Sequence, residues 1–229
     1  MVYNLAAIDM VEMNKNMRFS MWCEAKENRK VCVLMRGLPG SGKSYATDQV
    51  LKEFGGRDRA DHVFSTDDFW IQDILDMKRL LNQQGRTDTA FLDQVMKEKY
   101  RERWNWNKLG EAHKWNFDRF VDAVDKGVTP VIVDNVNSAA KEMRDYAECA
   151  KAGGYEIMIR EPSSPWWQEH SPLLRNKATN QDKIAQFAKI LAGRNAHGVP
   201  EETIIRMLNR WQPDLTPEDI LRKPPDVVQ

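Results

Sequence analysis

Short apolar runs alternate with longer amphipathic stretches along most of this chain. The runs at residues 30–37, 62–66, 129–135 and 155–161 are typical of strands buried on both faces of a parallel sheet. The stretches between them place apolar residues at helical spacing and end at glycines, as at Gly55-Gly56. Strands alternating with helices predict an α/β fold, a three-layer sandwich with a mostly parallel sheet covered on both faces.

The remaining segments predict the boundaries of this domain. We expect one domain over 30–211, with a helical insert at 71–103 that the string NQQGRTD divides into two helices. After residue 162 only helices are predicted, over 180–192 and 200–211, and residues 171–211 are expected to form a C-terminal lid with its helices. Residues 1–29 are expected to be an N-terminal leader with some helix, and 212–229 a C-terminal tail with a frayed end.

Composition narrows the class of protein. The 229 residues hold 34 basic and 34 acidic side chains, so any nucleic-acid contact must depend on a local basic surface. The three cysteines are odd in number and lack metal-ligand spacing, which is typical of a reducing compartment. No apolar run has the ~18 residues that a membrane span needs, and no signal peptide is evident. We predict an intracellular, cytoplasmic protein, or one in host cytoplasm if the source is viral, without a membrane partner.

A glycine-rich turn joins the first predicted strand to the first helix. Its sequence, GLPGSGKS, satisfies the pattern G-x-x-x-x-G-K-[ST], the phosphate-binding loop or P-loop, in which backbone N–H groups surround phosphate oxygens. Lys43 is expected to reach the β- and γ-phosphates and the Ser44 hydroxyl to ligate Mg²⁺. The guanine-reading string Asn-Lys-x-Asp does not occur, so the expected nucleotide is ATP. The predicted nucleotide-binding residues are Gly37, Leu38, Pro39, Gly40, Ser41, Gly42, Lys43 and Ser44.

Carboxylates follow two of the predicted strands. Asp67 and Asp68 come just after 62–66, and Asp134 lies at the end of 129–135. Ligands gather at the carboxyl ends of strands in open α/β sheets, and phosphoryl transfer to a hydroxyl needs a carboxylate for the proton and another for the metal. We expect one of Asp67 and Asp68 to be catalytic while the other caps a helix. Asp134 is expected to join Ser44 at the metal, or alternatively to brace the P-loop.

The ordered set GLPGSGKS, STDDF, LGEAHKWN, VIVDNVN, REPSSPWW and RNAHGVP resembles the polynucleotide 5′-hydroxyl kinase branch of P-loop kinases, in particular the members related to phage polynucleotide kinase. The resemblance covers roughly residues 31–211, apart from 71–103. It implies that Asp67 is the general base and that Arg194 belongs to a lid that clamps the ATP phosphates. The chain departs from that family at Trp70, which replaces an acceptor-binding arginine, and in lacking a second lid arginine.

Other side chains are candidates for contact with the acceptor substrate. Most of the eight tryptophans are expected to pack in the core, but Trp70, with Trp104 or Trp106, could stack a base near the acceptor. Residues 171–194 carry five basic side chains and one acidic, which suits either a solvated helix face or a lid. His113 is expected to be structural rather than catalytic. The candidate substrate contacts are Asp68, Trp70, Asn135, Asn137 and Arg175.

These features predict a phosphotransferase that moves the γ-phosphate of ATP, with Mg²⁺, to a hydroxyl on a nucleic acid, most readily a polynucleotide 5′-hydroxyl of RNA or DNA. The alternatives are a DNA kinase acting on a hydroxymethylated pyrimidine base, as in viral DNA hypermodification, and a kinase for a nucleoside or metabolite. A non-catalytic ATP-dependent switch or adaptor is the alternative from another class.

Overall fold

The structure of the chain is a computed structural model that describes residues 29–86, 90–196 and 198–222. The expected leader at 1–29 therefore lies outside the described residues except for Arg29. The expected fraying of the last seven residues also lies outside them.

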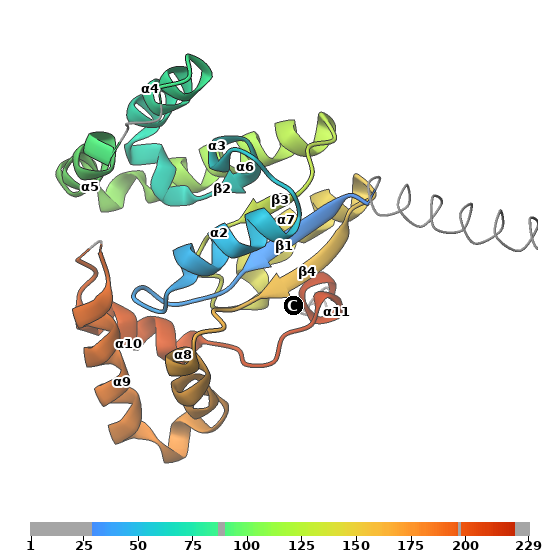
Figure 1. The fold of residues 1–229 in the computed structure, drawn as a ribbon. Coiled ribbons are helices and arrows are strands. Elements are labelled where there is room, and N and C mark those ends of the chain that lie inside the picture. Colours follow the sequence, from blue (N-terminus) through green and yellow to red (C-terminus); the bar gives the residue numbers. More distant parts are fainter. Residues whose placement is uncertain (1–28, 87–89, 197, 223–229) are drawn as a thin grey trace, which may run out of the picture.

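Four parallel strands form the described sheet in the order β2-β3-β1-β4 (Figure 1). They are β1 Val31–Met35, β2 Val63–Phe64, β3 Val131–Val133 and β4 Glu156–Arg160. Val33 of β1 pairs with Ile132 on one side and Met158 on the other, so the strand that leads into the P-loop is central. The predicted parallel α/β sandwich is confirmed.

All four strands are shorter than predicted, and for two of them the local reason is visible. β2 ends at Phe64 because the Ser65 hydroxyl accepts the N–H of Asp67 at 3.4 Å and starts a 3₁₀ helix, η1, over Thr66–Trp70. β3 starts after Pro130, which has no N–H to donate to a neighbouring strand.

Helices cover both faces of the sheet. The face that includes Cys32 and Leu34 packs against α6 and α7, and the face that includes Val33 and Met35 packs against α2 (Figure 1). The helices are α2 Lys43–Glu53, α3 Arg59–His62, α4 Gln72–Gln83, α5 Ala90–Arg103, α6 Leu109–Asp125, α7 Ala140–Ala152, α8 Pro165–His170, α9 Gln181–Arg194, α10 Glu201–Arg210 and α11 Pro217–Leu221. Further 3₁₀ helices are η2 Trp106–Lys108 and η3 Ser171–Thr179.

Two helical units extend from the sandwich on the side where the P-loop lies (Figure 1). The insert consists of α4 and α5, which ion pairs such as Lys78–Asp93 at 2.7 Å hold together. The second unit consists of α8, η3, α9 and α10, of which the last three lie within the 171–211 predicted as a lid, and the whole unit is called the lid below. It has its own buried cluster around Trp167, Phe187 and Leu191. The predicted insert and lid are both helical.

The segment after the lid returns to the sandwich. Within the expected tail at 212–229, α11 begins with a capping box in which the Thr216 hydroxyl accepts the N–H of Asp219 at 3.2 Å. Ile220 is fully buried in the cluster that α6 and α7 form against the sheet. This part of the segment is therefore packed in the core, because it carries one large apolar side chain to the sheet face.

Candidate active site

The P-loop has the geometry of an anion cradle. Gly40 and Gly42 have φ of +81° and +89°, conformations that favour glycine. A Cβ at Gly37 would lie 2.6 Å from the Ser41 hydroxyl, so the backbone there can curl only without a side chain. Ser41 is buried and its hydroxyl has no hydrogen-bond partner among the described residues. A buried hydroxyl in a glycine cradle fits a phosphate oxygen, which can accept its hydrogen bond.

The lid packs directly on this loop. A Cβ at Gly40 would lie 2.4 Å from the Leu191 carbonyl oxygen of α9, and the Arg194 guanidinium donates from Nε to the Gly40 carbonyl at 3.2 Å. Arg194 also stacks 4.2 Å above the Trp166 ring of α8. The arginine that the family resemblance selected is therefore held at the P-loop by lid residues.

Gly40→Ala is expected to destabilise the protein by about 2 kcal/mol more than Gly42→Ala. Both substitutions place alanine at positive φ, which costs about 1–3 kcal/mol. Only alanine at position 40 also meets lid backbone, because a Cβ at Gly42 has open space around it. Urea unfolding of the two variants measures the difference, and equal destabilisation would mean that α9 does not rest on the loop in solution.

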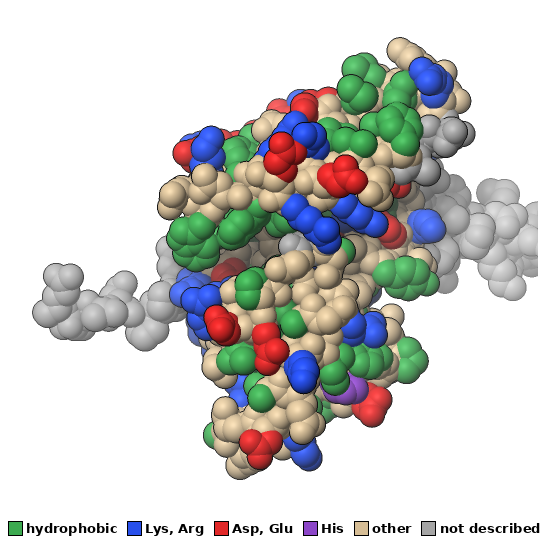
Figure 2. All heavy atoms as spheres, turned by 90° about the vertical axis from the view of Figure 1, so that its left-hand side faces the viewer, with side chains coloured by type: hydrophobic (Ala, Val, Ile, Leu, Met, Phe, Trp, Pro, Cys, Tyr) green, Lys and Arg blue, Asp and Glu red, His purple; other side chains and the backbone are tan. Residues whose placement is uncertain are grey.

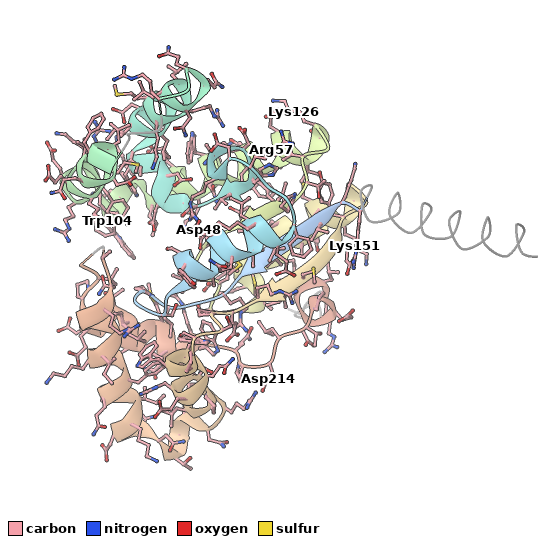
Figure 3. The ribbon with its side chains drawn as sticks, viewed as in Figure 1. Asp48, Arg57, Trp104, Lys126, Lys151 and Asp214 are labelled. Atoms are coloured by element: carbon pink, nitrogen blue, oxygen red, sulfur yellow. The ribbon has the colours of Figure 1, made fainter. Side chains whose placement is uncertain are left out.

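A chain of charges links the P-loop to the end of β3. The Lys43 ammonium forms an ion pair with Asp134 Oδ1, and Arg59 donates to Asp134 Oδ2 at 2.7 Å. Arg59 also pairs with Asp48 of α2 at 2.5 Å (Asp48 is labelled in Figure 3). Burial alone would raise the pKa of Asp134, but the two cations more than offset it and hold that pKa below its usual range. Asp134 is therefore an ionised carboxylate that braces Lys43.

The acidic pair lies at the neighbouring strand end, in η1. Asp67 accepts a hydrogen bond from the Tyr100 hydroxyl of α5 at 2.9 Å. Asp68 pairs with Arg119 of α6 at 3.4 Å. Burial raises the pKa of Asp68 to about 6, although Arg119 and Arg59 lower it. The two carboxylates thus have different partners, the first from the insert and the second from the sandwich.

The raised pKa of Asp68 has a consequence for stability. The folded protein holds the Asp68 proton more tightly than the unfolded chain, so this group's contribution to stability falls as pH rises from about 4 through about 6. A pKa raised from 3.8 to about 6 corresponds to about 3 kcal/mol at most. The stability of Asp68→Asn relative to wild type is therefore expected to increase between pH 4 and 7. Urea unfolding across that range measures it, and a constant difference would contradict it.

Asn135 joins the ends of the two strands. Its side-chain oxygen accepts the N–H of Thr66 at 3.0 Å, which fixes the start of η1 beside the end of β3. Thr66 also contacts His113 Nδ1 through its hydroxyl at 3.2 Å. Both contacts support the backbone that carries Asp67.

Three of the predicted substrate contacts are buried or paired in ways that do not present them to a substrate at this site. The Trp70 indole is 4% exposed and packs with Tyr100 and Ala112, so it cannot stack a base from solvent. Asn137 is buried, and its amide donates to the Met35 carbonyl at 2.7 Å, because the turn after β3 is tied to β1. Arg175 pairs with Asp214 at 2.8 Å, on exposed lid surface.

Three side chains that hold this site were missed at the sequence level. Arg59, Tyr100 and Arg119 come from α3, α5 and α6, outside the motifs. Tyr100 and Arg119 are each one of several aromatic or basic residues on a long helix, and Arg59 begins a helix of four residues, so no spacing rule singles any of them out. The only local signal was Asp58, whose carboxylate caps α3 by accepting the Ala60 N–H at 2.9 Å and so fixes the position of Arg59.

The site opens into a hollow between insert and lid. Figure 2 shows this recess from the P-loop side, with lysine and arginine side chains along its rim. At the mouth, Arg101 of α5 donates to the Ala196 carbonyl of the lid at 3.0 Å. A separate cavity of about 710 Å³ lies between α4 and α6, and Arg119 lines it.

The residues present fit a nucleotide with Mg²⁺. The site differs from the sequence expectation in the role of Asp134. The Ser44 side chain is exposed at the start of α2 and is free to ligate a metal. Both Asp134 carboxylate oxygens are bonded to cations, so Asp134 is available to a metal only when Lys43 turns to the phosphates. The described residues contain no cluster of three or more acidic, histidine or cysteine ligands.

A parallel sheet in this order, with a glycine-rich loop between its central strand and a helix, defines a nucleotide-binding protein of the P-loop class. Residues 32–213 match the family described as AAA domain, and the chain belongs to that P-loop family. The match covers the sandwich, the insert and the lid. Domains of this family are typical of kinase-like P-loop enzymes.

Curated relatives share the same region. The chain is 32% identical over 182 residues to NEDD4-binding protein 2 of Homo sapiens, covering 80% of this chain and 8% of the relative. It is 26% identical over 188 residues to YLP motif-containing protein 1 of Homo sapiens, covering 80% and 7%, and 26% identical over 198 residues to that of Mus musculus, covering 84% and 12%. The chain thus spans a small part of these relatives.

None of the described helices is long and apolar enough to cross a membrane.

Proposed function

We propose that this protein is a kinase that transfers the γ-phosphate of ATP to a hydroxyl on a nucleic acid, with a polynucleotide 5′-hydroxyl as the acceptor. The observation that carries the proposal is the position of Asp67. It lies at the carboxyl end of β2, next to the strand end that bears Asp134 and its Lys43 partner. In-line transfer to a hydroxyl requires a carboxylate beside the P-loop that accepts the proton of the attacking hydroxyl.

Each residue has a defined task in this reaction. Asp67 accepts the proton of the attacking hydroxyl, and the Tyr100 hydroxyl fixes the orientation of its carboxylate. Lys43 leaves Asp134 for the β- and γ-phosphates, while Arg59 keeps the buried Asp134 paired. Arg194 is already held at the P-loop, where it neutralises charge on the transferring group.

The metal and the lid complete the site. Ser44 would hold Mg²⁺, which would supply neutralisation of charge on the triphosphate. The lid and insert flank this hollow, and their closure over a bound nucleotide would exclude water and protect the γ-phosphate from hydrolysis.

The acceptor is tested with a panel. Labelled γ-phosphate is offered with Mg²⁺ to single-stranded RNA and DNA with 5′-hydroxyls, to duplex DNA with internal hydroxymethyl bases and blocked ends, and to free nucleosides. We expect label on the 5′-hydroxyl ends. Label only on the modified duplex or only on nucleosides would mean that the labelled molecule, and not a 5′-hydroxyl end, is the acceptor. ATP binding without any transfer would favour a nucleotide-dependent switch. The burial of Trp70 removes the feature that suggested a base hydroxyl as acceptor.

A further inference from the structure

Two tryptophans are exposed at the end of the insert. Trp104, just after α5, is 44% exposed, and Trp106, which begins η2, is 69% exposed. The other described tryptophans are buried or partly buried. A tryptophan usually stabilises a fold because its large apolar surface is buried. These two indoles are exposed, so they contribute little to packing.

Their position relates them to the active site. The Trp104 N–H donates to the Tyr100 carbonyl at 2.9 Å, so Trp104 lies one helical turn, or about 6 Å, beyond the residue that holds Asp67. Trp104 is at the edge of the insert that faces the lid (Figure 3). Arg101 of the same helix donates to the Ala196 carbonyl of the lid at the mouth of the hollow. A molecule whose reacting hydroxyl is at Asp67 therefore leaves the hollow beside these indoles.

The charge around the indoles is positive. Residues 97–108 carry five basic and two acidic side chains. Lys99 and Arg103 pair with Glu102 and Asp73. The remaining three cations, Lys97, Arg101 and Lys108, are exposed and form no ion pair with a described residue. Glu98 is the remaining carboxylate of this stretch, so three positive charges stand against one negative charge. The surface thus combines aromatic faces with uncompensated positive charge, although the chain as a whole is neutral.

We infer that Trp104 and Trp106, with Lys97, Arg101 and Lys108, form a platform for single-stranded nucleic acid next to its reacting end. This inference rests on the proposed function, because it takes the acceptor hydroxyl to be at Asp67. Unpaired bases stack on the indoles, and the cations contact the phosphates. A duplex offers no free base face, so the platform selects single strands. The sequence suggested stacking by Trp70 with Trp104 or Trp106, and this inference assigns it to Trp104 and Trp106 without the buried Trp70.

Binding measured without turnover tests the platform. The probe is a fluorescent single-stranded decanucleotide that already carries a 5′-phosphate, followed by anisotropy at low salt. We expect Trp104→Ala and Trp106→Ala each to weaken binding about tenfold, and a blunt duplex of the same sequence to bind more weakly than the single strand. Phe91→Ala is the matched control, since Phe91 is 57% exposed at the other end of α5, and its binding is expected to stay within twofold of wild type.

Transfer kinetics separate this inference from the proposed function. In Trp104→Ala/Trp106→Ala the KM for a 5′-hydroxyl oligonucleotide is expected to rise while the KM for ATP is unchanged. Unchanged oligonucleotide binding and KM in that variant would overturn the platform and leave the kinase intact. Indole-dependent binding in a protein that transfers phosphate to no acceptor would support the platform and overturn the kinase. A wild type that binds no oligonucleotide would overturn the platform.

Discussion

Asp67→Asn is expected to bind ATP as tightly as wild type and to transfer phosphate about 10²–10⁴-fold more slowly. The amide has the shape of the carboxylate and can still accept from the Tyr100 hydroxyl, so the fold is preserved. It cannot take up the proton of the attacking hydroxyl. Because the P-loop and its Lys43–Asp134 pair are untouched, the loss is expected in kcat rather than in the KM for ATP.

Asp68→Asn is the matched control for this variant. Asp68 is the next residue and carries the same group, but it pairs with Arg119 rather than with Tyr100. We expect it to lose less than tenfold in kcat. Quench-flow or steady-state assays of the two variants show which carboxylate is the general base. A larger loss of kcat in Asp68→Asn than in Asp67→Asn would mean that Asp68 is the base.

Lys43→Met is expected to abolish detectable transfer, weaken ATP binding at least tenfold and destabilise the protein by about 2 kcal/mol. The ammonium supplies charge to the β- and γ-phosphates. It also pairs with Asp134, whose side chain is 3% exposed. Removing one partner of a buried ion pair costs about 3–5 kcal/mol. The loss expected here is smaller than that range because Arg59 still pairs with Asp134.

A double-mutant cycle separates the two effects of Lys43→Met. In the background of Asp134→Asn the buried charge is absent, so adding Lys43→Met is expected to cost little further stability while still removing ATP binding. Urea unfolding and ATP titration of the four proteins measure this. Additive losses of stability would show that the Lys43–Asp134 pair does not brace the loop in solution.

Much of the architecture was predictable from the chain. The four apolar runs became the four strands, and for β1, β2 and β3 the reason is that a strand buried on both faces must be apolar throughout, as Val31–Met35 is. β4 lies at the edge of the sheet and is only partly buried, with charged residues at both of its ends. The P-loop was predictable because its glycines, its lysine and its serine are fixed by phosphate chemistry at set spacing. The position of Asp134 beside Lys43 followed from parallel strands sharing one carboxyl edge.

The contacts between distant helices were not predictable. Tyr100 reaches Asp67 across 33 residues of sequence, and Arg59 reaches Asp134 across 75. Such contacts depend on how α3 and α5 pack, which helical periodicity does not determine. The burial of Trp70 was not predictable for the same reason, because its indole packs against Tyr100 of α5 and Ala112 of α6.

Acceptor-dependent transfer of labelled γ-phosphate from ATP tests the central claim most directly. The assay compares one single-stranded oligonucleotide with a 5′-hydroxyl and the same oligonucleotide with a 5′-phosphate, in wild type and Asp67→Asn. The account predicts label at the 5′ terminus of the first oligonucleotide alone, and its loss in Asp67→Asn. Equal release of phosphate with both oligonucleotides, and label on neither, would contradict it.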